Sequence, residues 1–141
     1  MHVGNTHMKR IMKLALRDQI RIMVVDDMST SRGLITQALE AFGIRNVSTA
    51  ENGSDALMLL AKSPVHMVIS DYNMPNMDGL HLLQQLRSNQ ATKGIGFILI
   101  TGRAEQEIID YGKKLGMNNF LKKPFEPNDL RKCIEAVVGP L

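Results

Sequence analysis

Residues 66–79 read HMVISDYNMPNMDG, in which a short apolar run ends on the carboxylate of Asp71 and a turn-rich segment follows at once. A second apolar run, over residues 20–25, ends on two further carboxylates, Asp26 and Asp27. In a parallel sheet, ligands bind outside the carboxyl ends of the strands. Two such strands lying side by side would bring three acids to one edge of the sheet, which is the kind of site that binds a divalent cation.

The rest of the chain repeats this strand-then-helix pattern. Apolar runs predict strands at residues 20–25, 47–50, 67–70, 96–100 and 119–121. Amphipathic spacing and stop signals predict helices at residues 30–42, 53–63, 80–86, 105–115 and 126–138. Five consecutive βα units indicate an α/β fold, a doubly wound five-stranded parallel sheet with helices on both faces. The flavodoxin-like strand order 2-1-3-4-5 would place the first and third strands side by side.

Length and composition fit one soluble domain. A chain of 141 residues can bury a real core but is short for two domains. The single cysteine, Cys133, excludes an internal disulfide and fits a reducing, cytoplasmic setting. No apolar stretch approaches the roughly 20 residues of a membrane span.

The net charge of +3 is unevenly distributed along the chain. Residues 1–19 hold four basic side chains and one acid, so residues 20–141 carry no net charge. We therefore expect a basic N-terminal extension at 1–19, partly disordered or forming a short amphipathic helix over residues 8–16, and one domain at 20–141. A neutral domain also argues against nucleic-acid binding, which favours a basic face on the fold itself.

Two further strand ends add chemistry to the predicted acidic edge. The fourth strand ends at Thr101, and the fifth is followed by Lys123 and Pro124. A hydroxyl and an ammonium beside a cation form a set that binds phosphoryl groups. Each of these residues alone is more typical of a turn, a helix cap or solvated surface. Their coincidence at one sheet edge favours a phosphoryl site.

These motifs resemble the receiver domain of two-component response regulators, most closely the single-domain chemotaxis type. The resemblance covers residues 20 to about 138 and rests on four segments in order at the strand ends, which are Val25-Asp26-Asp27, Ser70–Gly79, Thr101-Gly102 and Lys123-Pro124-Phe125. It implies that Asp71 accepts a phosphoryl group from a histidine kinase. It also implies that Asp26, Asp27, Asp71 and the backbone carbonyl of Asn73 bind Mg²⁺, Asp26 through water.

The resemblance assigns roles to the remaining positions as well. Thr101 and Lys123 would contact the phosphoryl oxygens, and the Lys123–Pro124 bond would be cis. Thr101 and Phe120 would form the switch, although a plain core role for Phe120 is equally compatible. Asn73 and Arg103 occupy the positions that tune phosphoryl lifetime in the family.

The function implied is a cytoplasmic, monomeric signalling switch rather than an enzyme, catalysing only its own phosphorylation and dephosphorylation. Its expected protein partners are a chemotaxis-type histidine kinase and a flagellar motor switch protein or another protein target, unless it acts as a phosphate sink. A phosphorelay shuttle is the alternative. A Mg²⁺-dependent aspartyl phosphohydrolase is more remote, because such enzymes generally need a second acid where this chain has Asn73.

Overall fold

The computed structural model describes residues 17–103 and 105–141. Its strands are β1 (Arg21–Val25), β2 (Asn46–Ala50), β3 (Met67–Asp71), β4 (Gly96–Thr101) and β5 (Asn119–Lys122). Its labelled helices are α2 (Ser29–Ala41), α3 (Gly53–Lys62), α4 (Gly79–Arg87), α5 (Gln106–Lys114) and α6 (Pro127–Val138). Strands and helices alternate as predicted, and most boundaries differ from the expected ones by one residue.

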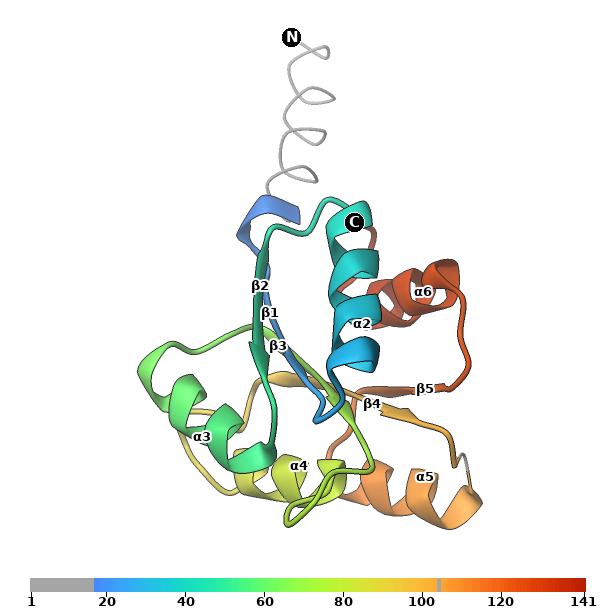
Figure 1. Ribbon diagram of the computed structural model, residues 1–141. Coiled ribbons are helices and arrows are strands. Elements are labelled where there is room, and N and C mark those ends of the chain that lie inside the picture. Colours follow the sequence, from blue (N-terminus) through green and yellow to red (C-terminus); the bar gives the residue numbers. More distant parts are fainter. Residues whose placement is uncertain (1–16, 104) are drawn as a thin grey trace, which may run out of the picture.

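The strands form one parallel sheet in the order β2-β1-β3-β4-β5 (Figure 1). The predicted doubly wound, flavodoxin-like fold is therefore confirmed. β1 and β3 are neighbours in this order, and their carboxyl ends are aligned because Val25 pairs with Ser70. The fold thus brings the two acid-bearing strand ends of the sequence together.

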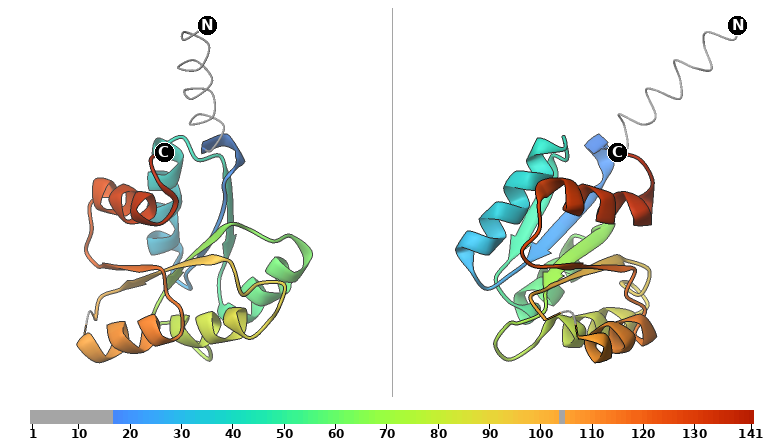
Figure 2. Two further views of the ribbon diagram at one scale, coloured as in Figure 1. Left: turned by 180° about the vertical axis from the view of Figure 1, so that it is seen from behind. Right: turned by 90° about the vertical axis from the view of Figure 1, so that its right-hand side faces the viewer.

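Helices cover both faces of the sheet, as the turned views in Figure 2 show. On one face α2 and α6 pack over β1, β3 and β4 in a cluster that includes Ile35, Leu39 and Ile134. On the other face α3 and α4 pack over the same strands, with Leu60 and Leu83 among their fully buried side chains. β3 is buried along its whole length, as the central strand between these two layers should be.

Local signals in the sequence explain where several helices begin and end. The side chain of Asn52 accepts a hydrogen bond from the Asp55 N–H at the start of α3, and Asp78 caps α4 through the His81 N–H. Gly43 follows α2 with a φ of 85°, the left-handed conformation that glycine adopts without strain. The beginning of α2 is different, because its N-cap residue is Met28 and no side chain caps it.

Two expectations concern the N-terminal extension and membranes. The predicted amphipathic helix over residues 8–16 lies outside the described residues, whereas residues 17–19 are helical. Within residues 17–103 and 105–141, no helix combines the length and the apolar character needed to span a bilayer.

Candidate functional site

The carboxyl ends of four strands meet at one edge of the sheet and carry the predicted site residues. Asp26 follows the last residue of β1, and Asp71 is the last residue of β3. Thr101 ends β4 and pairs with Lys122 of β5, so Lys123 lies immediately beyond that edge. The site residues come from segments far apart in the sequence and meet because the parallel register aligns these strand ends.

Three carboxylates gather at this edge. Asp26, Asp27 and Asp71 each offer one oxygen such that the three oxygens lie within 4.8 Å of one another. Asp26 is fully buried and Asp71 is 6% exposed, whereas Asp27 is exposed. Carboxylates this close repel one another unless a cation or a proton neutralises them.

The two carboxylate oxygens of Asp26 differ in their hydrogen bonding. Its Oδ1 accepts a hydrogen bond of 3.0 Å from the Met28 N–H. Its Oδ2 is buried and has no hydrogen-bond partner among the described residues. A buried anionic oxygen without a partner is costly. The donor set and this orphaned oxygen fit a hard divalent cation such as Mg²⁺, which takes oxygen ligands and keeps several waters.

Lys123 connects the acids to a helix on the other side of the site. Its Nζ lies 2.8 Å from Asp71 Oδ1 and 4.0 Å from Asp26 Oδ2. The same ammonium donates a 3.2 Å hydrogen bond to the Ser31 hydroxyl in the first turn of α2. Ser31 was not among the residues predicted from the sequence. No motif marks it, because its contact depends on how α2 packs beside the chain after β5.

The pKa of the Asp71 carboxyl is raised above its ordinary value of 3.8. Desolvation by burial is the main cause, and the charges of Asp26 and Asp27 add to it. The hydrogen bond and the positive charge of Lys123 oppose the rise without cancelling it. Burial, together with the two neighbouring acids, therefore disfavours the charged form of Asp71 more than Lys123 favours it.

The hydroxyl of Thr101 is engaged by its own loop. It accepts a 2.9 Å hydrogen bond from the Arg103 N–H and donates one of 3.2 Å to the Arg103 carbonyl. Thr101 itself is buried, while Arg103 is exposed and forms an ion pair with Glu105. To donate a hydrogen bond to a phosphoryl group on Asp71, the Thr101 hydroxyl would have to give up its hydrogen bond to the Arg103 carbonyl.

The other predicted positions lie around this centre. Asn73 is exposed two residues after Asp71, and Phe120 is half-buried against the cluster under α4. The Lys123–Pro124 peptide bond is cis. Asn73 and Pro124 thus lie close to Asp71 and Lys123, respectively, along the chain. Phe120 of β5 lies opposite Leu99 of β4.

The loop after Asp71 returns tightly to the strand. The Gly79 N–H donates to the Tyr72 carbonyl at 2.9 Å, and a Cβ on Gly79 would lie 2.5 Å from the Asp71 carbonyl oxygen. Only a residue without a side chain permits this approach. Gly79 is therefore a positioning residue for the Asp71 loop.

The sequence is similar to known proteins along most of its length. The family "Response regulator receiver domain" matches residues 22–135. A probable chemotaxis protein CheY of Rhizobium etli is 38% identical over 91% of this chain and 99% of its own length. CheY1 of Helicobacter pylori is 37% identical over 85% of this chain and 98% of its own.

Solved structures agree with these relatives. Chemotaxis protein CheY4 of Vibrio cholerae, crystallised at low pH, superposes with a TM-score of 0.79 at 30% identity, over 84% of this chain and 98% of that one. The family match spans most of the chain and includes every strand end that carries the acids, Thr101 and Lys123. The chain belongs to the response regulator receiver domain family.

Proposed function

We propose that this protein is a single-domain response regulator whose Asp71 accepts a phosphoryl group from a histidine kinase. The observation that supports this most strongly is the pairing of Asp71 with Lys123 at 2.8 Å beside two further acids. A nucleophilic carboxylate, a cation site and a fixed ammonium are the parts that phosphoryl transfer needs.

The transfer itself requires little covalent chemistry from the protein. An Asp71 carboxylate oxygen attacks phosphorus, the bond from phosphorus to the donor's imidazole nitrogen breaks, and the donor leaves as neutral histidine after taking up a proton. The product is an acyl phosphate on Asp71. Lys123 offsets charge on the phosphoryl oxygens, and Thr101 becomes available to them once its hydroxyl leaves the Arg103 carbonyl.

Mg²⁺ is the proposed cofactor. Asp26, Asp27, Asp71 and the backbone carbonyl of Asn73 would hold it, with Asp26 acting through a water molecule. When bound, the ion offsets the charge of the carboxylates and of the incoming phosphoryl group. The orphaned Oδ2 of Asp26 is the structural support for this assignment.

The output of the switch is proposed to be protein–protein contact. Phosphorylation adds roughly −1.5 to −2 charge and new acceptor oxygens at Asp71. Movement of Thr101 toward that group would change the space beside Phe120. The face that would report the change comprises α5, β5 and α6, on which Tyr111 is an exposed aromatic side chain.

We propose a cytoplasmic chemotaxis pathway, of which the names of the relatives support the chemotaxis part. Two relatives that align along nearly their whole length are named chemotaxis proteins. We therefore propose a chemotaxis-type kinase as donor and, as target, either a flagellar motor switch protein or no target at all, in which case the protein drains phosphoryl groups. Arg103 and Asn73 would set the lifetime of the acyl phosphate.

Incubation with Mg²⁺ and acetyl phosphate tests the proposal. Intact-protein mass spectrometry should show the addition of one phosphoryl group, and Asp71→Asn should abolish it. Asp110→Asn, on the exposed surface of α5, is the matched control and should be phosphorylated normally. Absence of the mass increase in the wild type would reject the proposal, and steady turnover of phosphomonoesters would favour a phosphohydrolase instead.

A second experiment separates the possible outputs. Pull-downs with the phosphorylated protein and with Asp71→Asn should differ in what they retain. Retention of a motor switch protein by the phosphorylated form alone supports motor control. Reversible exchange of the phosphoryl group with a histidine phosphotransfer protein would instead support a shuttle.

A further inference from the structure

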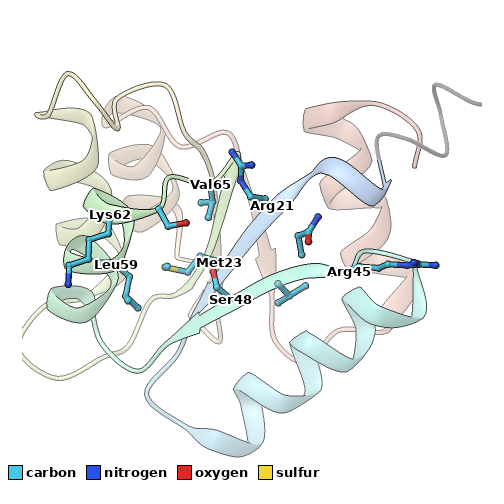
Figure 3. Close-up of a pocket in the computed structure, with 10 residues that line it drawn as sticks. Arg21, Met23, Arg45, Ser48, Leu59, Lys62 and Val65 are labelled. Carbon is cyan, nitrogen blue, oxygen red and sulfur yellow. The ribbon is translucent and has the colours of Figure 1, made fainter.

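A groove lies at the end of the sheet opposite to Asp71. It has a volume of about 400 Å³ and runs between the amino ends of β1 and β2 and the last turns of α3. Figure 3 shows Met23 and Ser48 on its floor, with Leu59 and Lys62 of α3 along one side. It shares no residue with the phosphoryl site.

The groove exists because α3 covers only part of β2. On the face toward α3, β2 presents Ala50, Ser48 and Asn46, since side chains alternate along a strand. Ala50 is buried under α3, whereas Ser48 and Asn46 are exposed. The short side chain of Ser48 leaves open the space beside the nearly buried Met23 and Val65. Leu59 of α3, which is 41% exposed beside this space, is the aliphatic side chain that a partner can reach.

Positive charge surrounds this aliphatic floor. Arg21, Arg45 and Lys62 line the groove, and no acidic side chain of the described residues does. Arg45 has an ion pair with Asp18 at 3.7 Å, but both side chains are largely exposed, so the pair is weak. The groove therefore favours a negatively charged occupant.

The outer edge of β2 offers backbone hydrogen-bonding groups beside the groove. β2 is at the end of the strand order, with β1 as its neighbour in the sheet. Because the Ala50 carbonyl accepts from the Asp26 N–H on the β1 side, the alternate residues Val47 and Thr49 direct their N–H and C=O groups outward. Such an edge can pair with an added strand.

We propose that this groove binds an extended acidic peptide segment of a partner protein, which adds as a strand to the edge of β2. An apolar side chain of the peptide enters the space left by Ser48, and its carboxylates meet Arg21, Arg45 and Lys62. A second copy of this chain would bring like charges together. The basic residues 1–19 are excluded on the same ground.

The lining also favours a peptide over single-stranded nucleic acid. Nucleic-acid grooves of this kind combine cations with aromatic side chains on which bases stack. The apolar side chains that line it are aliphatic, namely Met23, Leu59 and Val65. The inference goes beyond the proposed phosphoryl switch and does not depend on it.

A labelled peptide tests the proposal with the full chain. The probe is a fluorescein-labelled octapeptide Glu-Ser-Val-Ser-Glu-Ser-Val-Ser, in which Glu and Val share one face of the extended strand. Its binding is measured by fluorescence anisotropy at low and at physiological ionic strength. Lys62→Glu should weaken binding about tenfold, as should Ser48→Leu, which fills the hollow without changing charge. Lys113→Glu on the exposed surface of α5 makes the same charge change elsewhere and should leave binding unchanged.

Nuclear magnetic resonance checks how the peptide binds. Strand addition predicts slower amide exchange at Val47 and Thr49 when the peptide is present. Equal weakening by Lys62→Glu and Lys113→Glu, or unchanged exchange at both amides, would overturn the proposal. Tighter binding of an oligonucleotide or of anionic phosphatidylserine vesicles than of the peptide would overturn it as well. Lys62→Glu should still accept a phosphoryl group from acetyl phosphate at the wild-type rate.

Discussion

At the carboxyl ends of the strands, three acids lie close to the half-buried Lys123. At the amino ends of β1 and β2, by contrast, the cations Arg21, Arg45 and Lys62 surround an open groove. Asp26 and Asp71 are buried, and one oxygen of Asp26 has no hydrogen-bond partner among the described residues. The three cations are exposed, and so is the ion pair of Arg45 with Asp18. The first site therefore holds electrostatic energy that a small, highly charged ligand can release.

The second site holds no comparable energy. Exposed charges are screened by salt and contribute modestly, so binding there should be weak and sensitive to ionic strength. The same protein thus combines a preorganised reaction centre with an adaptable docking surface at opposite ends of one sheet. The following substitutions test how far this contrast holds.

Removal of the Lys123 ammonium should have the largest effect. Lys123→Ala deletes the only cation within 4.0 Å of both Asp26 and Asp71 among the described ion pairs. Loss of one preorganised charge partner costs roughly 10²–10³ in rate. The initial rate of phosphoryl incorporation from acetyl phosphate should fall by about 100-fold, measured by mass spectrometry.

The exposed neighbour Lys122 provides the control for this experiment. Lys122→Ala should retain nearly the wild-type rate. Similar losses in the two variants would mean that general positive charge, and not the position of Lys123, supports the reaction. In that case the contrast between a preorganised and an adaptable end of the sheet would fail.

Close packing of the loop after Asp71 is the next feature to test. Gly79→Ala places a Cβ 2.5 Å from the Asp71 carbonyl oxygen and 2.7 Å from Leu99 Cδ1. Overpacking of this kind costs about 1–3 kcal/mol, so the free energy of unfolding in urea should fall by about 2 kcal/mol. Gly94→Ala, which meets nothing within 4 Å, should change stability little.

The cation affinity of the acidic cluster can be measured directly. Asp26→Asn removes a charge and one of the possible oxygen ligands, so the affinity for Mg²⁺ should fall at least about tenfold. Isothermal titration calorimetry with the metal alone measures this without any phosphodonor. Asp110→Asn should not alter the titration, and an unchanged affinity in Asp26→Asn would show that Asp26 takes no part in the cation site.

Much of this site follows from the sequence because it is topological. Alternating apolar runs predict parallel strands, and the strand order then places Asp26, Asp71, Thr101 and Lys123 at one edge. Even the four-residue β5 is predicted, as a minimal strand over residues 119–121. What a parallel sheet dictates by register alone could be predicted.

Contacts that depend on helix packing could not be predicted. The hydrogen bond from Lys123 to Ser31 requires a particular position of α2, and a serine in a first helical turn looks like ordinary capping. The segment Met28-Ser29-Thr30 looks like helix-cap chemistry in the sequence, yet Met28 is the N-cap residue of α2 and no side chain caps this helix. The groove likewise depends on how far α3 extends over β2, which strand and helix patterns do not specify.

The smallest effect tests the idea that the metal-free site is destabilised by its own charge. The raised pKa of Asp71 means that the folded protein binds its proton more tightly than the unfolded chain does. Wild-type stability is therefore lost as the pH rises through that pKa, above the ordinary value of 3.8. Asp71→Asn has no ionisable group at this position, so its stability does not fall in this way. In EDTA at pH 7 its Tm should exceed that of the wild type by about 2–4 °C, which corresponds to roughly 1 kcal/mol.

The pH dependence of this difference identifies its cause. The gap in Tm should close as the pH falls through and below 3.8, because the wild-type carboxyl is then neutral in both the folded and the unfolded state. Mg²⁺ at neutral pH should raise the Tm of the wild type more than that of Asp71→Asn, since it offsets the same charge. Lys62→Glu changes one charge at the opposite end, where the side chain is exposed, and should show none of this pH dependence. A Tm gap that persists unchanged at pH 4 would mean that the asparagine stabilises through packing, and the acidic end would then store no electrostatic energy for a ligand to release.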